Sequence, residues 1–232
     1  MDASRILYED NHIIVINKRP GEIVQGDKTG DKPMVEELKE YIKERDHKPG
    51  NVFMGVVHRL DRPVGGAVIF AKTSKALTRL NEMLRLGKIH KTYWALTRGL
   101  PEPPAATLTH YLTSVERNNK SYVSTTPRPD AKEARLEYRM LASGETFNLL
   151  EIKLLTGRKH QIRAQLSAIG CPIRGDLKYG DRRSNPDGSI SLLARSIDLV
   201  HPVSAKPLHI EAPVPEERVW VQLQQSIAHE QD

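Results

Sequence analysis

Hydrophobic positions along the chain follow two patterns, and the short extended pattern is the more frequent one. Alternating or continuous apolar residues predict strands over residues 11–17, 52–57, 66–71, 90–98, 107–115, 121–125, 133–141, 147–155, 192–199 and 207–211. Apolar residues three or four apart predict a helix that starts at Pro33, a helix capped by Ser74, and two more over residues 159–169 and 216–228. Because strands outnumber helices and do not alternate regularly with them, we expect an α+β fold with a mixed, largely antiparallel sheet flanked by helices.

The length and composition limit the organisation of the chain. Its 232 residues fit one large domain or two small ones, and 38% hydrophobic with 28% charged residues is typical of a soluble globular protein. We expect a single domain over residues 1–232, with a hinge near the Gly- and Pro-rich residues 99–104. Cys171 is the single cysteine, which excludes an internal disulfide and a multi-cysteine zinc site. With no apolar run of 18 residues and no signal-peptide core, a cytoplasmic location is the simplest interpretation.

The distribution of charge is more informative than the net charge of +6. Residues 57–91 carry eight Lys or Arg and two acids, and residues 153–183 carry the same numbers, so each segment has a net charge of +6. The rest of the chain is therefore acidic. If the two basic segments meet in space, they form a surface suited to phosphate groups, although each could also be an ordinary solvated face.

The segment His58–Gly66 holds the strongest candidate for chemistry. Asp61 lies between Arg59 and Arg62, and cationic neighbours keep a carboxylate ionised and attract anions. Pro63 favours an extended Arg62, and the glycine pair that follows would let a substrate backbone come close. This composition predicts a nucleophile that acts on a polyanion, with a surface turn as the structural alternative.

A second basic segment, residues 156–163, surrounds the start of a predicted helix. Arg158 and Lys159 would lie at the positive end of that helix, which is a favourable place for a phosphate. Arg163 lies about 100° from the buried Ile162 around the helix, so it borders the core and can reach inward to a carboxylate. Earlier in the chain, Lys91 and Tyr93 share one face of a predicted strand, where Tyr93 could stack on a base.

Several motifs in sequence order resemble a known enzyme family. These are H-R-L-D at residues 58–61, K-T-Y at 91–93 and T-G-R-K-H-Q-I-R at 156–163, together with I-N-K-R-P-G at 16–21 and G-D-x-x-Y-G at 175–180. They resemble the motifs of the RluA-type RNA pseudouridine synthases, and the similarity extends from about residue 7 to residue 221. The resemblance implies the pseudouridine synthase fold, with an RNA cleft between two lobes, and a reaction that needs neither metal nor cofactor.

The resemblance also assigns roles to particular residues. Asp61 matches the catalytic aspartate of the family, Tyr93 its active-site tyrosine, and Arg163 the arginine that pairs with the aspartate. The predicted RNA-binding residues are Arg59, Arg62, Lys91, Arg158, Lys159 and His160. The expected partner is structured RNA, either ribosomal or transfer RNA, bound by a monomer without a separate N-terminal RNA-binding domain. No membrane or DNA partner is expected.

The chain departs from the family pattern near its proposed nucleophile. Pro63-Val64-Gly65 stands where the family commonly has Thr-Ser-Gly, Arg19 extends the usual Lys-Pro turn, and Gln165 replaces a frequent histidine. Two other functions stay open at this point. A non-catalytic RNA-binding or ribosome-assembly protein would share the basic segments, and a nucleoside or glycoside hydrolase would need a second acid that the sequence does not offer beside Asp61.

Overall fold

A computed structural model of the chain describes residues 1–229, which divide into two compact units. The first unit comprises Met1–His90 and Ala194–Ala212, and the second comprises Lys91–Leu193 and the chain from Pro213 onward. Residues 99–104 lie inside the second unit, and a hinge there stays a prediction.

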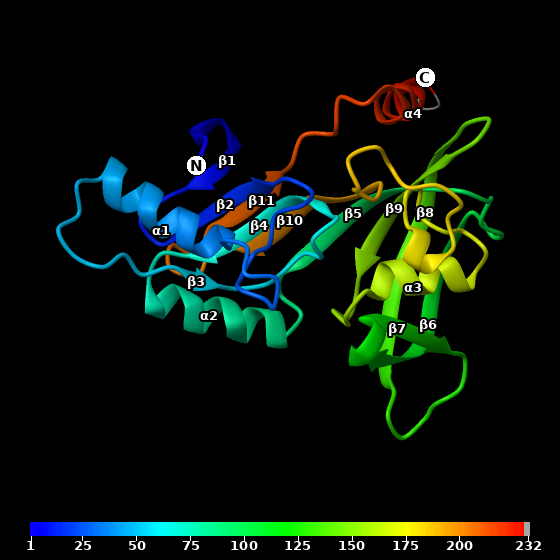
Figure 1. Ribbon diagram of the computed structural model, residues 1–232, viewed down its shortest axis with the longest axis horizontal. Helices are drawn as coiled ribbons and strands as arrows, with labels where there is room; N and C mark the ends of the chain where they lie inside the picture. The colour runs from blue at the N-terminus through cyan, green and yellow to red at the C-terminus, as the bar shows by residue number, and fades with distance from the viewer. Residues whose placement is uncertain (230–232) are drawn as a thin grey trace. The chain divides into compact units, whose positions relative to one another are not determined.

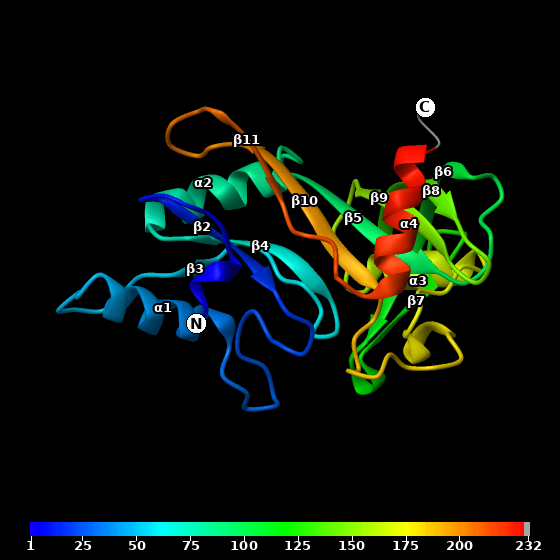
Figure 2. The same ribbon diagram turned by 90° about the horizontal axis from the view of Figure 1, so that it is seen from above.

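The first unit is a sheet with helices on its two sides. Its strands are β1 (Ile6–Glu9), β2 (Ile13–Lys18), β3 (Gly55–Val56), β4 (Gly65–Ala71), β10 (Leu192–Val200) and β11 (Pro207–Glu211). β1 pairs with β2, β2 with β4, β3 with β4 and β10 with β11, all antiparallel. Figure 2 shows β2 and β4 between the helices α1 (Met34–Arg45) and α2 (Ser74–Arg85). β4 is buried along its whole length, as expected for a strand covered on both faces.

The two helices of this unit begin where local chemistry favours it. Pro33 precedes α1, where the missing N–H of proline costs nothing, and Met34, Leu38 and Ile42 are buried along one face. Thr73 rather than the expected Ser74 caps α2, because its Oγ1 accepts a hydrogen bond from the backbone N–H of Ala76 at 3.2 Å.

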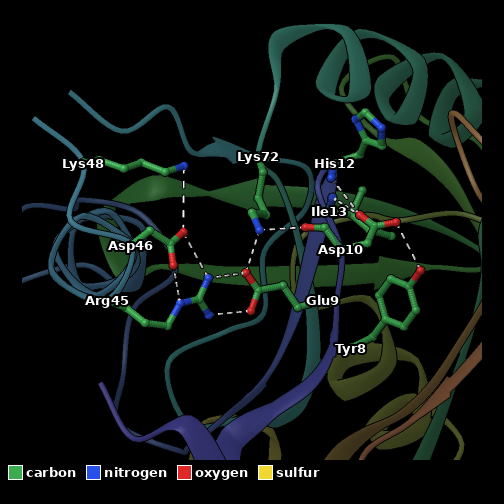
Figure 3. Close-up of polar contacts among 9 residues, drawn as sticks. All are labelled: Tyr8, Glu9, Asp10, His12, Ile13, Arg45, Asp46, Lys48 and Lys72. Carbon is green, nitrogen blue, oxygen red and sulfur yellow. Dashed lines mark hydrogen bonds and ion pairs between the residues drawn. The ribbon is translucent and has the colours of Figure 1, made fainter. Parts of the chain in front are cut away.

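An ion-pair network fastens β1 to α1 and to the end of β4 (Figure 3). Glu9 accepts two hydrogen bonds from Arg45, at 2.7 and 2.8 Å, and one from Lys72 at 2.6 Å. Arg45 also contacts Asp46, which follows α1. Hydrogen bonds from Arg45 first, and then from Lys72, lower the pKa of Glu9. The network thus links elements that lie far apart in the sequence.

The second unit is an antiparallel sheet with a helix packed on each of two strand pairs. Its strands are β5 (His90–Thr97), β6 (Ala105–Val115), β7 (Lys120–Ser124), β8 (Lys132–Ser143) and β9 (Asn148–Leu154), in the order β5-β9-β8-β6-β7. The helix α3 (Gln161–Ala168) contacts β6 and β7, and α4 (Arg218–His229) contacts β8 and β9. Figure 1 shows α3 in front of these strands.

The expected α+β class with a mainly antiparallel sheet is confirmed. β1 was not expected from the sequence, and α3 begins two residues later than predicted. His160 adopts a left-handed conformation with φ 53°, and the side chain of Gln161 accepts a hydrogen bond from the backbone N–H of Arg158 at 2.9 Å, so the preceding residues form a turn instead of helix.

Within residues 1–229, none of the helices has both the length and the apolar character needed to cross a membrane.

Candidate functional site

Asp61 lies on a tight turn between β3 and β4 in the first unit. The backbone N–H of Val64 donates to the carbonyl of Asp61 at 3.0 Å, so residues 61–64 form a hydrogen-bonded turn with Arg62 and Pro63 at its centre. The backbone N–H of Gly21 donates to the carbonyl of Arg62 at 2.8 Å and fastens this turn to the segment after β2. The half-buried Asp61 is therefore carried by a short loop with a fixed backbone.

The buried ammonium of Lys18 donates hydrogen bonds to the backbone of this loop. Lys18 is 1% exposed, and its Nζ donates to the carbonyl oxygens of Val64 at 2.7 Å, Arg62 at 3.0 Å and Asp61 at 3.4 Å. Burial lowers the pKa of Lys18 to about 8, although the carboxylates of Glu22 and Asp61 oppose the shift. The side chain of Lys18 at the end of β2 thus holds the main chain of the candidate nucleophile and of the residues that follow it.

Gly66, which follows this loop, does not provide the space for a substrate backbone that the sequence suggested. Gly66 has φ +113°, and a Cβ added there would lie 2.3 Å from the carbonyl oxygen of Ala194. The space beside Gly66 is therefore filled by the backbone of β10 and does not receive a substrate. Only glycine fits this position, because it tolerates both the positive φ and the close approach of the neighbouring strand.

The arginines beside Asp61 have different surroundings. Arg62 donates to Asp31 at 2.6 Å and to Thr29 Oγ1 at 2.7 Å, so acids from the loop before α1 engage its guanidinium. Arg59 is exposed. His58 accepts the backbone N–H of Ile69 through Nε2 at 3.2 Å, which fixes its ring against β4. The proposed RNA contacts of Arg59 and Arg62 stay predictions.

Tyr93 and Arg163, the two other predicted catalytic residues, lie in the second unit. Tyr93 is 6% exposed on β5, opposite Ile152 of β9, and Lys91 projects from the same face of the strand. Arg163 is also 6% exposed and lies on α3. Because Asp61 belongs to the first unit, its pairing with Arg163 stays a prediction.

The guanidinium of Arg163 is held by a carboxylate that sequence reasoning missed. Its Nε donates to Asp176 Oδ2 at 2.7 Å and its Nη2 donates to Asp176 Oδ1 at 2.9 Å, and Asp176 is 1% exposed. This is a bidentate, buried ion pair, which fixes the plane of the guanidinium. The ring of Tyr179 supports it from one side, with its centroid 5.0 Å from Cζ of Arg163.

Tyr179 in turn joins α3 to the sheet. Its hydroxyl accepts the backbone N–H of Ser121 at 2.8 Å and lies 2.9 Å from Nδ1 of His160. His160, predicted to bind RNA, is 8% exposed and serves here as an internal partner of Tyr179. Asp176 and Tyr179 belong to the G-D-x-x-Y-G motif, which the sequence displayed without indicating what either side chain does.

The remaining basic residues lie in the loop before α3. Arg158 donates through Nε to the carbonyl of Glu133 at 2.9 Å, and Lys159 is exposed.

In the described part of the chain, His, Cys, Asp and Glu side chains form no group of three that could hold a metal ion. The first unit carries the loop carboxylate of Asp61, and the second carries the buried Tyr93, the fixed guanidinium of Arg163 and the basic loop before α3.

Comparisons with known proteins place this chain in a family. Residues 12–168 match the family described as RNA pseudouridylate synthase, and this match covers more than half of the chain, including Asp61, Tyr93 and Arg163. The chain belongs to the RNA pseudouridylate synthase family. The resemblance inferred from the motifs is confirmed.

Curated members of the RNA pseudouridylate synthase family are similar over most of this chain. The ribosomal large subunit pseudouridine synthase D of Xanthomonas campestris is 32% identical over 91% of the chain and 66% of the relative. An RNA pseudouridine synthase of Bacillus subtilis, YlyB, is 32% identical over 91% of the chain and 69% of the relative. The chain thus spans about two thirds of the length of the curated relatives that it matches.

Solved structures of the family share the fold. The structure described as human RNA pseudouridylate synthase domain containing 4 has a TM-score of 0.78 and 24% identity, and the match covers 97% of this chain and 93% of the other. The domain containing 1 structure has a TM-score of 0.70 and 22% identity. At these identities the likeness concerns the fold alone, and the expected pseudouridine synthase fold is confirmed.

Proposed function

We propose that this protein isomerises uridine to pseudouridine within structured RNA. The observation that carries the proposal is the family match over residues 12–168, which spans the three predicted catalytic residues. In the reaction the N1–C1′ bond of uridine breaks, the uracil turns, and a C5–C1′ bond forms while the C5 proton leaves. The arrangement of Asp61 on a rigid loop supports the proposal, because an essential carboxylate must be held in place while the base moves.

Each catalytic residue has a role in this proposal. Asp61 supplies the carboxylate that acts on the sugar or the base, and Arg163 supplies the positive counter-charge that keeps a carboxylate ionised. Tyr93 contacts the target base and relays the C5 proton, directly or through water. The fixed orientation of Arg163 on Asp176 supports its role, since a preorganised charge stabilises a transition state without reorganising.

The proposed substrate is an RNA whose target uridine leaves its stack to reach the site. Flipping a base costs a few kcal/mol, which phosphate contacts and stacking offset. Arg59, Arg62, Lys91, Arg158 and Lys159 are the proposed sources of such contacts. Because relatives of this chain are named for large-subunit ribosomal RNA and for transfer RNA, we propose one of these, with large-subunit ribosomal RNA preferred, as the partner of a cytoplasmic monomer.

The proposal is tested with RNA carrying tritium at C5 of uridine. We expect the protein to release tritium to water, and we expect Asp61→Asn to abolish release while RNA binding survives. Asp130→Asn, at an exposed aspartate in the loop before β8, is the matched control and should behave as the unaltered protein. Undiminished release by Asp61→Asn would refute the role of Asp61. RNA binding without release would indicate a non-catalytic binding protein, and free labelled uracil would indicate a hydrolase.

A further inference from the structure

Lys91 has an unusual position at the start of β5. Its side chain shares a face of the strand with Tyr93 and reaches the loop before α3. A Cβ added to Gly157 would lie 3.9 Å from Nζ of Lys91 and would meet no other atom within 4 Å. The exposed Gly157 therefore has open space beside it, and the ammonium borders that space.

Within the described residues, no group of opposite charge lies against this ammonium. Within residues 1–229, Nζ of Lys91 makes neither a hydrogen bond nor an ion pair, whereas Lys18 donates to carbonyl oxygens and Lys72 to the Glu9 carboxylate. Burial lowers the pKa of Lys91, and no neighbouring carboxylate opposes that shift. Withdrawing an unpaired charge from water costs free energy, and an anion bound beside it would offset that cost.

The neighbours of Lys91 favour an anion of phosphate type. Lys91 is the last residue of the first basic segment and Gly157 lies in the second, so one residue from each segment borders this space. Lys159 is exposed in the same loop, while the side chain of Arg158 is turned to the carbonyl of Glu133. Phosphate oxygens accept hydrogen bonds from an ammonium and approach glycine backbone closely, which a bulkier side chain at position 157 would prevent.

We propose that Lys91 and the Gly157–Lys159 loop bind one backbone phosphate of the RNA, next to the nucleotide that Tyr93 contacts. The contact positions the strand and reads no base, because a phosphate carries no sequence information. This inference rests on the proposed function for the identity of the ligand as RNA. It assigns Lys91 to binding and not to proton transfer.

The test compares Lys91→Met with Lys91→Arg and with Lys153→Met. Lys153 is an exposed lysine opposite Thr92, so it lies on the other face of the sheet and serves as the control. RNA affinity is measured over a range of salt concentrations with the full chain and a structured ribosomal RNA transcript. We expect Lys91→Met to weaken binding about three- to tenfold and to reduce the salt dependence by about one phosphate contact, a slope change of about 0.7–0.9.

The variants separate a phosphate contact from other roles. Lys91→Arg should keep most of the affinity, Lys153→Met should match the unaltered protein, and Lys91→Met should raise KM while leaving kcat within about twofold. An unchanged salt slope in Lys91→Met, or a loss confined to kcat, would overturn the inference. Failure of tritium release by the unaltered protein, with the slope still reduced by Lys91→Met, would remove the proposed function and leave the phosphate site.

A measurement on the unaltered protein covers the case in which Lys91→Met does not fold. Lysine is labelled with ¹³C at Cε, and the Lys91 resonance, assigned with Lys91→Arg, is titrated with and without RNA. Binding of a phosphate beside the ammonium should raise the pKa of Lys91, since the anion favours the charged form. A pKa of Lys91 that RNA leaves unchanged would overturn the inference.

Discussion

The two units hold their predicted catalytic residues in different ways. In the first unit the loop of Asp61 is fixed through main-chain carbonyls gathered around one ammonium, that of Lys18. In the second unit Arg163 is fixed through side chains, by the carboxylate of Asp176 and the ring of Tyr179. A loop held by its backbone tolerates changes of side chain, whereas a guanidinium held by a carboxylate is sensitive to the loss of that side chain.

This difference explains where the chain departs from the family pattern. Pro63-Val64-Gly65 stands in place of Thr-Ser-Gly within the loop, and the bonds that fix the loop use the carbonyls of Asp61, Arg62 and Val64. The carbonyl is present whatever the side chain is. In contrast, the G-D-x-x-Y-G segment that supplies Asp176 and Tyr179 keeps the expected residues.

The ion pair of Arg163 with Asp176 is the side-chain anchor, and the hydrogen bonds from Lys18 to the loop carbonyls are the backbone anchor. Removal of the Asp176 carboxylate tests the side-chain anchor most directly. Asp176→Ala would leave the buried guanidinium of Arg163 without this partner, and breaking a buried ion pair costs about 3–5 kcal/mol of the free energy of unfolding. Denaturant unfolding measures this loss. We also expect tritium release by the folded fraction to fall, because Arg163 is no longer oriented.

Asp176→Asn is the matched control for this prediction. Asparagine keeps the shape and one acceptor oxygen but removes the negative charge of residue 176, so it should recover part of the stability lost in Asp176→Ala. Full activity in a folded Asp176→Ala protein would contradict the idea that Arg163 depends on this carboxylate.

A smaller effect is expected when the backbone anchor is removed. Lys18→Met would leave the buried carbonyl of Val64 without its donor, whereas the carbonyls of Asp61 and Arg62 keep bonds to the N–H groups of Val64 and Gly21. One unsatisfied buried acceptor costs about 1–3 kcal/mol, so unfolding by denaturant should show a loss of that size. Equal losses for Lys18→Met and Asp176→Ala would erase the contrast between the two anchors.

The pH dependence of stability checks the same lysine. The pKa of Lys18 is about 8 in the folded protein and 10.5 when unperturbed, so between these pH values the unfolded chain binds more protons. The free energy of unfolding of the unaltered protein should therefore rise relative to Lys18→Met as the pH increases from about 8 to 10.5. A difference that stays constant over this range would show that burial does not lower the pKa of Lys18.

The sequence predicted the helices, strands and motifs that depend on the local pattern of residues. The apolar spacing of Met34, Leu38 and Ile42 predicted α1, and the alternation along the chain predicted most strands to within two or three residues. The motifs also drew attention to Asp61, Tyr93 and Arg163. The start of α3 was placed too early, because the side chain of Gln161 closes a turn that periodicity does not reveal.

The anchors could not be predicted, because each is a tertiary contact. Lys18 contacts backbone atoms 43–46 residues away, and no side-chain pattern reports a main-chain acceptor. Asp176 lies 13 residues after Arg163 in a different segment, and the resemblance pointed to Asp61 as the partner of Arg163, so nothing in the sequence singled out Asp176. His160 was expected to bind RNA, and that contact stays a prediction; the contact of its buried ring with Tyr179, 2.9 Å from Nδ1 to the hydroxyl, was not predicted.

The smallest effect is expected for the side chain of Arg62, which lies beside Asp61 and takes part in neither anchor. Its partners Asp27 and Asp31 are exposed, and exposed ion pairs contribute little to stability because water and salt screen them. Arg62→Ala should therefore leave the unfolding midpoint within experimental error, and any loss should appear in RNA affinity and grow at low salt. A clear fall in the unfolding midpoint would mean that the Asp61 loop also depends on a side chain, and the proposed contrast between a backbone-held loop and a side-chain-held guanidinium would fail.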